Sequence, residues 1–223
     1  MVANNAGANA EGLRLDYDAY PDTDSSAPWS PPDVVRVQYP GNDAGNGATG
    51  GWIFDGTARS WKRLYMCMAI KFESPYVTHT NKEKLWYPLG TNGMNTLLEV
   101  QTVPTQDATT GEMRLFLDTQ WGGGASNEEF AQASGPYIQK GAWQVIETYM
   151  VMNTPGSSDG VFQAWINGTP VMSHSTVGYS TADTVWTQPR WTGTRGGGAS
   201  SVLTPSGGQR RWYDRVAAWG NPL

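Results

Sequence analysis

The sequence predicts an all-β protein with the antiparallel two-sheet β-sandwich of a jelly roll. Apolar and polar residues alternate with the period of a strand in several segments, most clearly in Trp61–Phe72 and Trp143–Asn153. The 27 glycines and 14 prolines recur at intervals typical of short strands joined by tight turns. No segment sustains the apolar repeat of a long helix. Together these observations favour about ten short strands in two packed sheets.

The stretch Trp143–Gly168 (WQVIETYMVMNTPGSSDGVFQAWING) predicts a long β-hairpin, because two alternating segments flank the turn-rich Thr154–Gly160. That turn pairs the two strands so that one sheet face carries polar groups between aromatic rings, namely Glu147, Tyr149, Gln163 and Trp165. Aromatic rings stack on the apolar faces of sugars while their polar neighbours bind hydroxyl groups, so this face is the candidate ligand-binding surface. A slip of one residue in register would send these side chains to opposite faces.

The remaining strands follow from the same alternation. Trp61–Phe72 is largely apolar on both faces, which predicts a strand that is buried on both sides. Asn127–Ala133 is expected to form a short helical turn on a loop. Residues 1–10 are small and polar and predict a flexible arm, followed by one domain over residues 11–223. Further strands are expected at residues 11–17, 33–39, 83–88, 94–103, 112–121, 142–153, 160–166, 169–174, 183–191 and 209–219.

The charge of the chain restricts its partners. A net charge of −5, with only 15 Lys and Arg spread along the chain, argues against nucleic acid, which needs clustered cations. A neutral polysaccharide or surface glycan suits this balance better, although Lys84 and Arg114 could form a local pocket for one carboxylate. Cys67 is the only cysteine, so no internal disulfide can form and a packed thiol is expected.

The first residues, MVANNAGANAEG, have neither the basic nor the apolar region of a signal peptide, and no stretch is apolar enough to span a membrane. The expected location is therefore extracellular, as a mature form whose signal has been removed, or the surface of a virion assembled inside a lysing host. In the second case the partners include other copies of this chain or other components of the assembly.

The 11 tryptophans and 10 tyrosines need an explanation, and two are open: stacking on sugars, or packing between the sheets. Core packing is favoured for Trp61, Trp143 and Trp219. Four tryptophans beside polar or glycine-rich neighbours have a proposed place on the ligand-binding surface, with core packing as the alternative: Trp86, Trp121, Trp165 and Trp191.

The hairpin also carries a resemblance to a known family. The pattern formed by Trp143, Glu147, Asn153-Thr154, Asp159-Gly160 and the closing Trp-x-Asn-Gly resembles the concanavalin A-like lectin/glucanase superfamily, in particular its polysaccharide-lyase-type and laminin G-like members. Two further segments agree: the strand Trp61–Phe72 followed by His79, Asn81, Lys84 and Tyr87, and the run Gly196–Gly198 leading to Trp212, Tyr213, Asp214 and Val216. The resemblance covers residues 59–219 and implies a jelly-roll fold with a carbohydrate ligand.

Two enzymatic reactions can be compared with this pattern. A retaining glycosidase needs two carboxylates about 5 Å apart, and no strand carries such a pair on one face, although Asp118 could join Glu147 from a neighbouring strand. Polysaccharide β-elimination needs a base and a group that neutralises the uronate carboxyl, and the candidates are His79, Lys84, Arg114 and Tyr149. The Gln-x-His and Arg-x-Glu-x-Arg signatures of alginate-lyase-type members are absent.

No cofactor is expected. Calcium is possible, because Asp159 could contribute to a loop site, but Asp159-Gly160 before a strand is first of all a turn signal. Three functions therefore stay open: carbohydrate binding as the main interpretation, a structural or decoration protein of a virion or cell surface, and a polysaccharide lyase.

Overall fold

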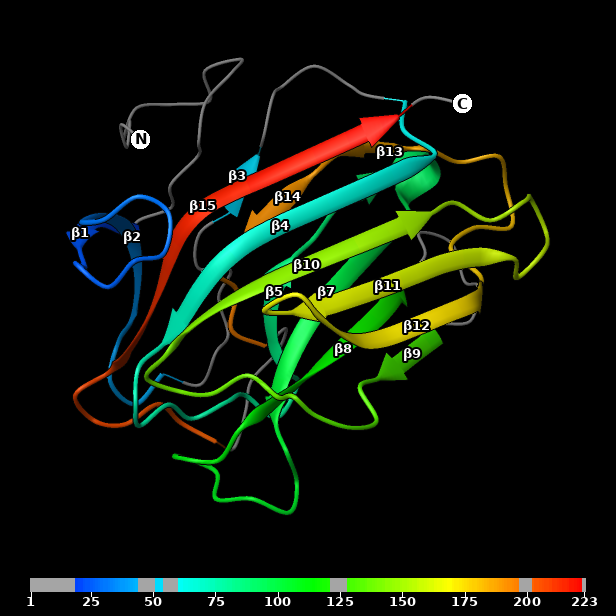
Figure 1. The fold of residues 1–223 in the computed structure, drawn as a ribbon. Coiled ribbons are helices and arrows are strands. Elements are labelled where there is room, and N and C mark those ends of the chain that lie inside the picture. The colour runs from blue at the N-terminus through cyan, green and yellow to red at the C-terminus, as the bar shows by residue number, and fades with distance from the viewer. Residues whose placement is uncertain (1–18, 44–50, 54–59, 121–127, 197–201, 222–223) are drawn as a thin grey trace.

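The computed structural model describes residues 19–43, 51–53, 60–120, 128–196 and 202–221. These residues form two antiparallel sheets packed face to face (Figure 1), so the predicted two-sheet β-sandwich is confirmed. The described residues contain no α-helix, only a 3-10 turn at Thr91–Gly93. Within the same ranges no helix is long and apolar enough to cross a membrane.

One sheet, here called sheet A, has seven strands and lies in front in Figure 1. In spatial order its strands are β1 (Ala19–Thr23), β2 (Asp33–Tyr39), β15 (Gln209–Asn221), β4 (Arg63–Phe72), β10 (Trp143–Val151), β11 (Gly160–Ile166) and β12 (Thr169–Val177). The predicted hairpin is confirmed as β10 and β11, paired in one continuous register. Asn167 and Gly168 both have positive φ, 50° and 76°, as the type I′ turn between β11 and β12 requires.

The other sheet, sheet B, has eight strands and lies behind sheet A in the same view. Its main path runs β13 (Trp186–Gln188), β6 (Leu89–Gly90), β7 (Asn95–Thr102), β5 (Glu83–Trp86), β14 (Arg190–Thr192) and β3 (Gly51–Ile53). Two further strands extend it from β7, first β8 (Met113–Gln120) and then β9 (Glu128–Ala131).

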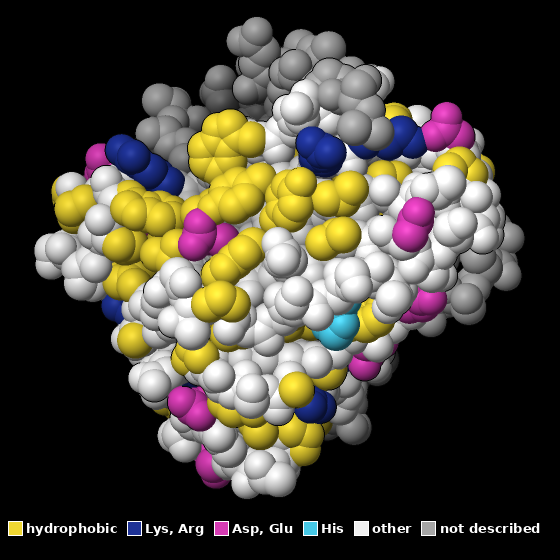
Figure 2. Space-filling model, turned by 45° about the vertical axis from the view of Figure 1, so that its right-hand side comes forward, with side chains coloured by type: hydrophobic (Ala, Val, Ile, Leu, Met, Phe, Trp, Pro, Cys, Tyr) yellow, Lys and Arg dark blue, Asp and Glu magenta, His cyan; other side chains and the backbone are white. Residues whose placement is uncertain are grey.

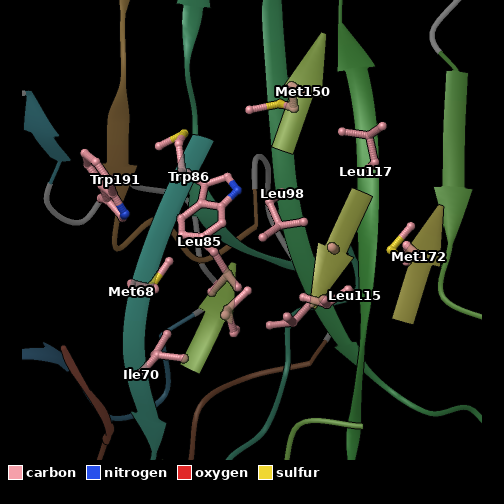
Figure 3. Packing of buried hydrophobic residues seen from close by; sticks show 14 of the residues in the cluster. Met68, Ile70, Leu85, Trp86, Leu98, Leu115, Leu117, Met150, Met172 and Trp191 are labelled. Carbon is pink, nitrogen blue, oxygen red and sulfur yellow. The ribbon is translucent and has the colours of Figure 1, made fainter. Parts of the chain in front are cut away.

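The core fills the space between the sheets, with side chains from alternate positions of each strand (Figure 3). Met68 and Ile70 of β4 face Leu98 of β7 and Leu115 of β8, and all four are fully buried. Each such side chain contributes about 1.5–3 kcal/mol through its removal from water. The alternating residues of Trp61–Phe72 that include Met68 and Ile70 therefore form the face of β4 that packs against sheet B.

A buried ionic cluster crosses the core. Glu83 of β5 lies 3.5 Å from Arg195 and 4.0 Å from Arg211 of β15, and all three side chains are fully buried. The Glu83 carboxylate also accepts hydrogen bonds from the Tyr76 hydroxyl at 3.2 Å and the His79 amide at 2.9 Å. Removing one member of such a cluster would leave a buried charge without compensation. The cluster therefore ties sheet A to sheet B.

Several local expectations need correction. Asn127–Ala133 is predicted to hold a helical turn, but Glu128–Ala131 is strand β9, because its backbone pairs with β8. The strand expected at residues 183–191 is divided into β13 and β14 at Pro189, which has no amide hydrogen for a ladder bond. The edge strand β1 is not predicted, since its Pro21 argues against a strand. The arm expected at residues 1–10 and the strand at 11–17 lie outside the described residues.

Candidate functional site

The outward face of sheet B carries charged and polar side chains in cross-strand rows. Lys84 of β5 lies opposite Glu99 of β7, which lies opposite Phe116 of β8. In the next row Gln101 lies opposite Arg114. Their neighbours along each strand, such as Glu83, Leu98 and Leu115, point into the core. We call this surface the charged face; it consists of Lys82, Lys84, Tyr87, Glu99, Gln101, Arg114, Phe116, Asp118, Glu129 and Arg190.

Arg114 is a cation on this face with unused hydrogen-bonding capacity. Its guanidinium carbon lies 4.7 Å from the centre of the Phe116 ring, a cation-π contact that holds the group against the sheet. Its Nε atom is buried and has no hydrogen-bond partner among the described residues. The Arg114 side chain as a whole is partly exposed, and a carboxylate is the acceptor that a guanidinium binds best. The surroundings of Arg114 therefore suit an anionic group.

Lys84 and Tyr87 form a second pair on the charged face. The Lys84 Nζ lies 5.8 Å from the centre of the Tyr87 ring, and within the described ranges this ammonium makes no hydrogen bond or ion pair. Burial raises the pKa of the Tyr87 phenol, while the positive charge of Arg190 acts in the opposite direction. The pair therefore combines an ammonium and a phenol, two groups that can exchange protons with a ligand.

Glu99 lies between these groups and is almost fully buried, with 3% of its surface exposed. Burial raises its pKa to about 7, against the opposing charges of Lys82 and Lys84. The Lys82 ammonium lies 3.6 Å from Glu99 and also binds Glu129 on β9. The charge of this face therefore changes near neutral pH.

The outward face of sheet A is different, because it is aromatic. One row crosses four strands from Trp219 of β15 through Tyr65 and Tyr149 to Gln163 of β11. The next row runs from Cys67 through Glu147 to Trp165. The predicted placing of Glu147, Tyr149, Gln163 and Trp165 on one face is thus confirmed by the register. Figure 2 shows hydrophobic side chains gathered across one face of the molecule with an acidic side chain among them.

The loop between β1 and β2 closes one end of this aromatic surface. Asp24 accepts hydrogen bonds from the Trp143 indole at 3.2 Å and from the Lys71 ammonium at 2.7 Å. The Trp212 indole donates to Asp22 at 2.9 Å, and the Lys71 ammonium lies 5.5 Å from the Trp212 ring. Trp143 and Trp212 therefore tie this segment to the outward face of sheet A, and Trp143 does not lie in the core where it is predicted.

The four candidates for β-elimination do not form one site. Lys84 and Arg114 share the charged face of sheet B, whereas Tyr149 lies on the outward face of sheet A, across the sandwich. His79 is fully buried, and its Nδ1 accepts the amide hydrogen of Asn81 at 2.8 Å, so a substrate cannot reach this ring. The structure therefore places His79 in the core and separates Tyr149 from Lys84 and Arg114.

Three tryptophans proposed for the ligand surface also need comment. Trp86 and Trp191 are 1% and 0% exposed, and their rings pack edge-on in the core with centres 6.3 Å apart, so the predicted place of both on a ligand surface is wrong (Figure 3). Trp121 lies outside the described residues. Conversely, Trp219 is predicted in the core and is 58% exposed, because its strand position points away from sheet B.

Asp159 closes the turn of the hairpin. Its two carboxylate oxygens accept hydrogen bonds from the amide of Thr154 at 2.6 Å and from its hydroxyl at 2.7 Å. Over the described ranges no group of three or more His, Cys, Asp or Glu side chains is arranged to hold a metal ion.

Sequence reasoning missed Tyr87, Glu99 and Gln101 as members of a site with Lys84 and Arg114. The alternation within β7 does place Glu99 and Gln101 on one face. That signal did not indicate which other strands share the sheet, because those contacts join distant segments.

Comparison with known proteins identifies no protein-family model and no curated protein that matches this chain. Solved structures do match. A variant of the alginate lyase Aly36B in complex with alginate trisaccharide has a TM-score of 0.66 and 18% identity, covering 91% of this chain and 88% of that one. The alginate lyase vAL-1 from Chlorella virus matches with a TM-score of 0.61 and 12% identity, covering 95% of this chain and 92% of that one. An endo-β-1,4-glucuronan lyase from Trichoderma reesei matches with a TM-score of 0.60 and 12% identity, covering 94% of this chain and 90% of that one. The chain shares the fold of these polysaccharide lyases.

Proposed function

We propose that this chain is a polysaccharide lyase that cleaves a uronate-containing polysaccharide by β-elimination on the charged face of sheet B. The observation that carries the proposal is the convergence of Lys84 and the partly exposed Arg114 on one face of sheet B. The shared fold of three polysaccharide lyases supports it. Lyase activity is therefore favoured over carbohydrate binding as the main function.

The reaction defines what each group must do. A base removes the proton on C5 of the uronate, next to the carboxyl group, and the electron pair forms the C4=C5 double bond. The bond from C4 to the glycosidic oxygen breaks, and that oxygen takes up a proton. Negative charge builds on the carboxyl group as the C5 proton leaves, so a fixed cation at the carboxyl lowers the barrier.

The charged face offers one group for each task. Arg114, with the amide of Gln101 beside it, binds and neutralises the uronate carboxyl. Lys84 in its neutral form removes the C5 proton. Tyr87, whose ring lies 5.8 Å from the Lys84 ammonium, returns a proton to the leaving oxygen.

The test is the ultraviolet absorbance of the new C4=C5 bond, measured with alginate and with glucuronan as separate substrates. Lys84→Met and Arg114→Met should each lower kcat/KM about 100-fold or more, the usual cost of removing a group that acts on transition-state charge. Tyr87→Phe should lower kcat. Arg36→Met is the matched control, because Arg36 lies on sheet A and pairs with Asp22 at 3.3 Å.

The control should keep its activity, and all four variants should keep their circular dichroism spectra. Absence of unsaturated product from the wild-type chain on both substrates would refute the proposal. Full activity of Arg114→Met would refute the assignment of the carboxyl-binding group.

A further inference from the structure

We propose a second carbohydrate site on the outward face of sheet A, which binds a linear neutral glycan and is independent of the proposed lyase function. It consists of Trp219, Tyr65, Tyr149, Gln163, Glu147 and Trp165, here called the aromatic patch. The patch and the charged face lie on opposite outer surfaces of the sandwich, because they belong to different sheets that share one core.

The patch is an extended platform. The row from Trp219 through Tyr65 and Tyr149 to Gln163 crosses four adjacent strands in direct register. Three strand intervals of about 4.8 Å make it about 14 Å long, the size of a short oligosaccharide. Trp219 is 58% exposed, and the other five side chains are partly exposed. The rings of Tyr65 and Trp219 lie 5.3 Å apart and are tilted by 50°.

Polar groups stand among the rings at the spacing that sugar hydroxyls need. Glu147 lies between Cys67 and Trp165 in the adjacent row and accepts a hydrogen bond from the Tyr65 hydroxyl. That bond uses one of its carboxylate oxygens, and a carboxylate can accept several more. Gln163 adds an amide with donors and an acceptor at the end of the aromatic row. Rings for the faces of sugars and acceptors for their hydroxyls are therefore present together.

The central carboxylate also decides between possible occupants. The cores of protein interfaces are depleted of charged residues, so a second copy of this chain would leave Glu147 in an unfavourable position. An acidic polysaccharide would place its carboxylates against Glu147, which favours a neutral chain. The fitting occupant is a linear neutral glycan whose hydroxyl groups donate to Glu147 while its ring faces stack on Trp219 and Trp165.

The test is isothermal titration of the full chain with cellohexaose, mannohexaose, xylohexaose and laminarihexaose, and with an alginate hexasaccharide as the acidic comparison. The wild-type chain should bind at least one neutral hexasaccharide through this patch. Trp219→Ala and Glu147→Gln should each weaken that binding at least ten-fold.

Two control variants separate the patch from its surroundings. Trp143→Ala removes an indole from the same sheet face at the end that Asp24 and Lys71 cover, and its affinity should stay within two-fold of wild type, about the spread expected for a surface change. Arg114→Met alters the charged face and should also bind normally. The second control distinguishes failure of this inference from failure of the lyase proposal.

Three results would overturn the inference. The first is that no neutral hexasaccharide binds, and the second is that Trp219→Ala leaves the affinity unchanged. The third is that the wild-type chain binds the alginate hexasaccharide more tightly than any neutral one and that Trp219→Ala abolishes this binding. Sedimentation of the free chain adds a fourth: a dimer that Trp219→Ala dissociates would assign the patch to a second copy instead.

Discussion

Replacing Glu99 with glutamine should remove a pH dependence of stability that the charged face creates. Burial raises the pKa of Glu99 from its ordinary value of 4.5 to about 7 in the folded chain. Between these two values the unfolded chain releases its Glu99 proton while the folded chain keeps it. The folded state therefore binds more protons, and its stability falls as pH rises through this window.

The size of the effect follows from the two pKa values. Stability changes by about 1.4 kcal/mol for each pH unit while one proton separates the two states. From pH 4.5 to about 7 the loss reaches up to about 3 kcal/mol, and above pH 7 it stays constant because both states are ionised. A glutamine side chain does not titrate, so the Glu99→Gln variant should gain stability relative to wild type by this amount across the window.

The measurement is urea unfolding followed by tryptophan fluorescence from about pH 4 to about pH 8 at constant ionic strength. The difference in free energy of unfolding between wild type and Glu99→Gln is the relevant quantity, because other titrating groups cancel. Glu129→Gln, which removes the more exposed partner of Lys82, is the control and should change stability by less than about 1 kcal/mol. A stability difference that stays constant with pH, or that increasingly favours wild type as pH rises, would contradict this prediction and show that Lys82 keeps Glu99 ionised in the folded chain.

Three further predictions concern the fold. Trp86→Ala should lower the free energy of unfolding by about 3–5 kcal/mol, because it empties a fully packed site, whereas the exposed Trp219→Ala should change it by about 0.5 kcal/mol or less; urea unfolding measures both. Asn153→Ala should cost at least about 2 kcal/mol in the same assay, since the buried Asn153 carbonyl oxygen accepts the amide hydrogens of Tyr179 and Ser180, which would lose their partner. Cys67 should react with a thiol reagent about 100-fold more slowly in the folded chain than in urea, because burial and the nearby Glu147 raise its pKa from 9.0 to about 11, and equal rates would contradict this.

Much of the fold could be predicted from local pattern. Alternation located β2 at residues 33–39 and β11 at residues 160–166 with the bounds that the structure has. The turn at Thr154–Gly160 set the register of the hairpin, so the shared face of Glu147 and Trp165 followed from a contact between neighbouring segments. Such contacts depend on strand geometry and turn length, which the sequence encodes directly.

The composition of the charged face depended on the tertiary structure. Lys84, Glu99 and Arg114 meet because β5, β7 and β8 are neighbours in sheet B, while Tyr149 belongs to sheet A. Alternation identifies the residues that share a face of one strand. It does not indicate which sheet the strand joins, because that depends on pairing between segments far apart in the chain.

The tryptophans show the same division. Trp86 and Trp219 both lie in strands with alternating neighbours, yet one is 1% exposed and the other 58%. Their burial depends on whether their side of the strand faces the partner sheet or the outside of the sandwich. Local sequence pattern predicts most of the strands, the turn of the main hairpin and the face that each residue shares with its neighbours. The packing of sheet A on sheet B decided which of those faces are core and which are open to a ligand, because burial is a property of the assembled layers.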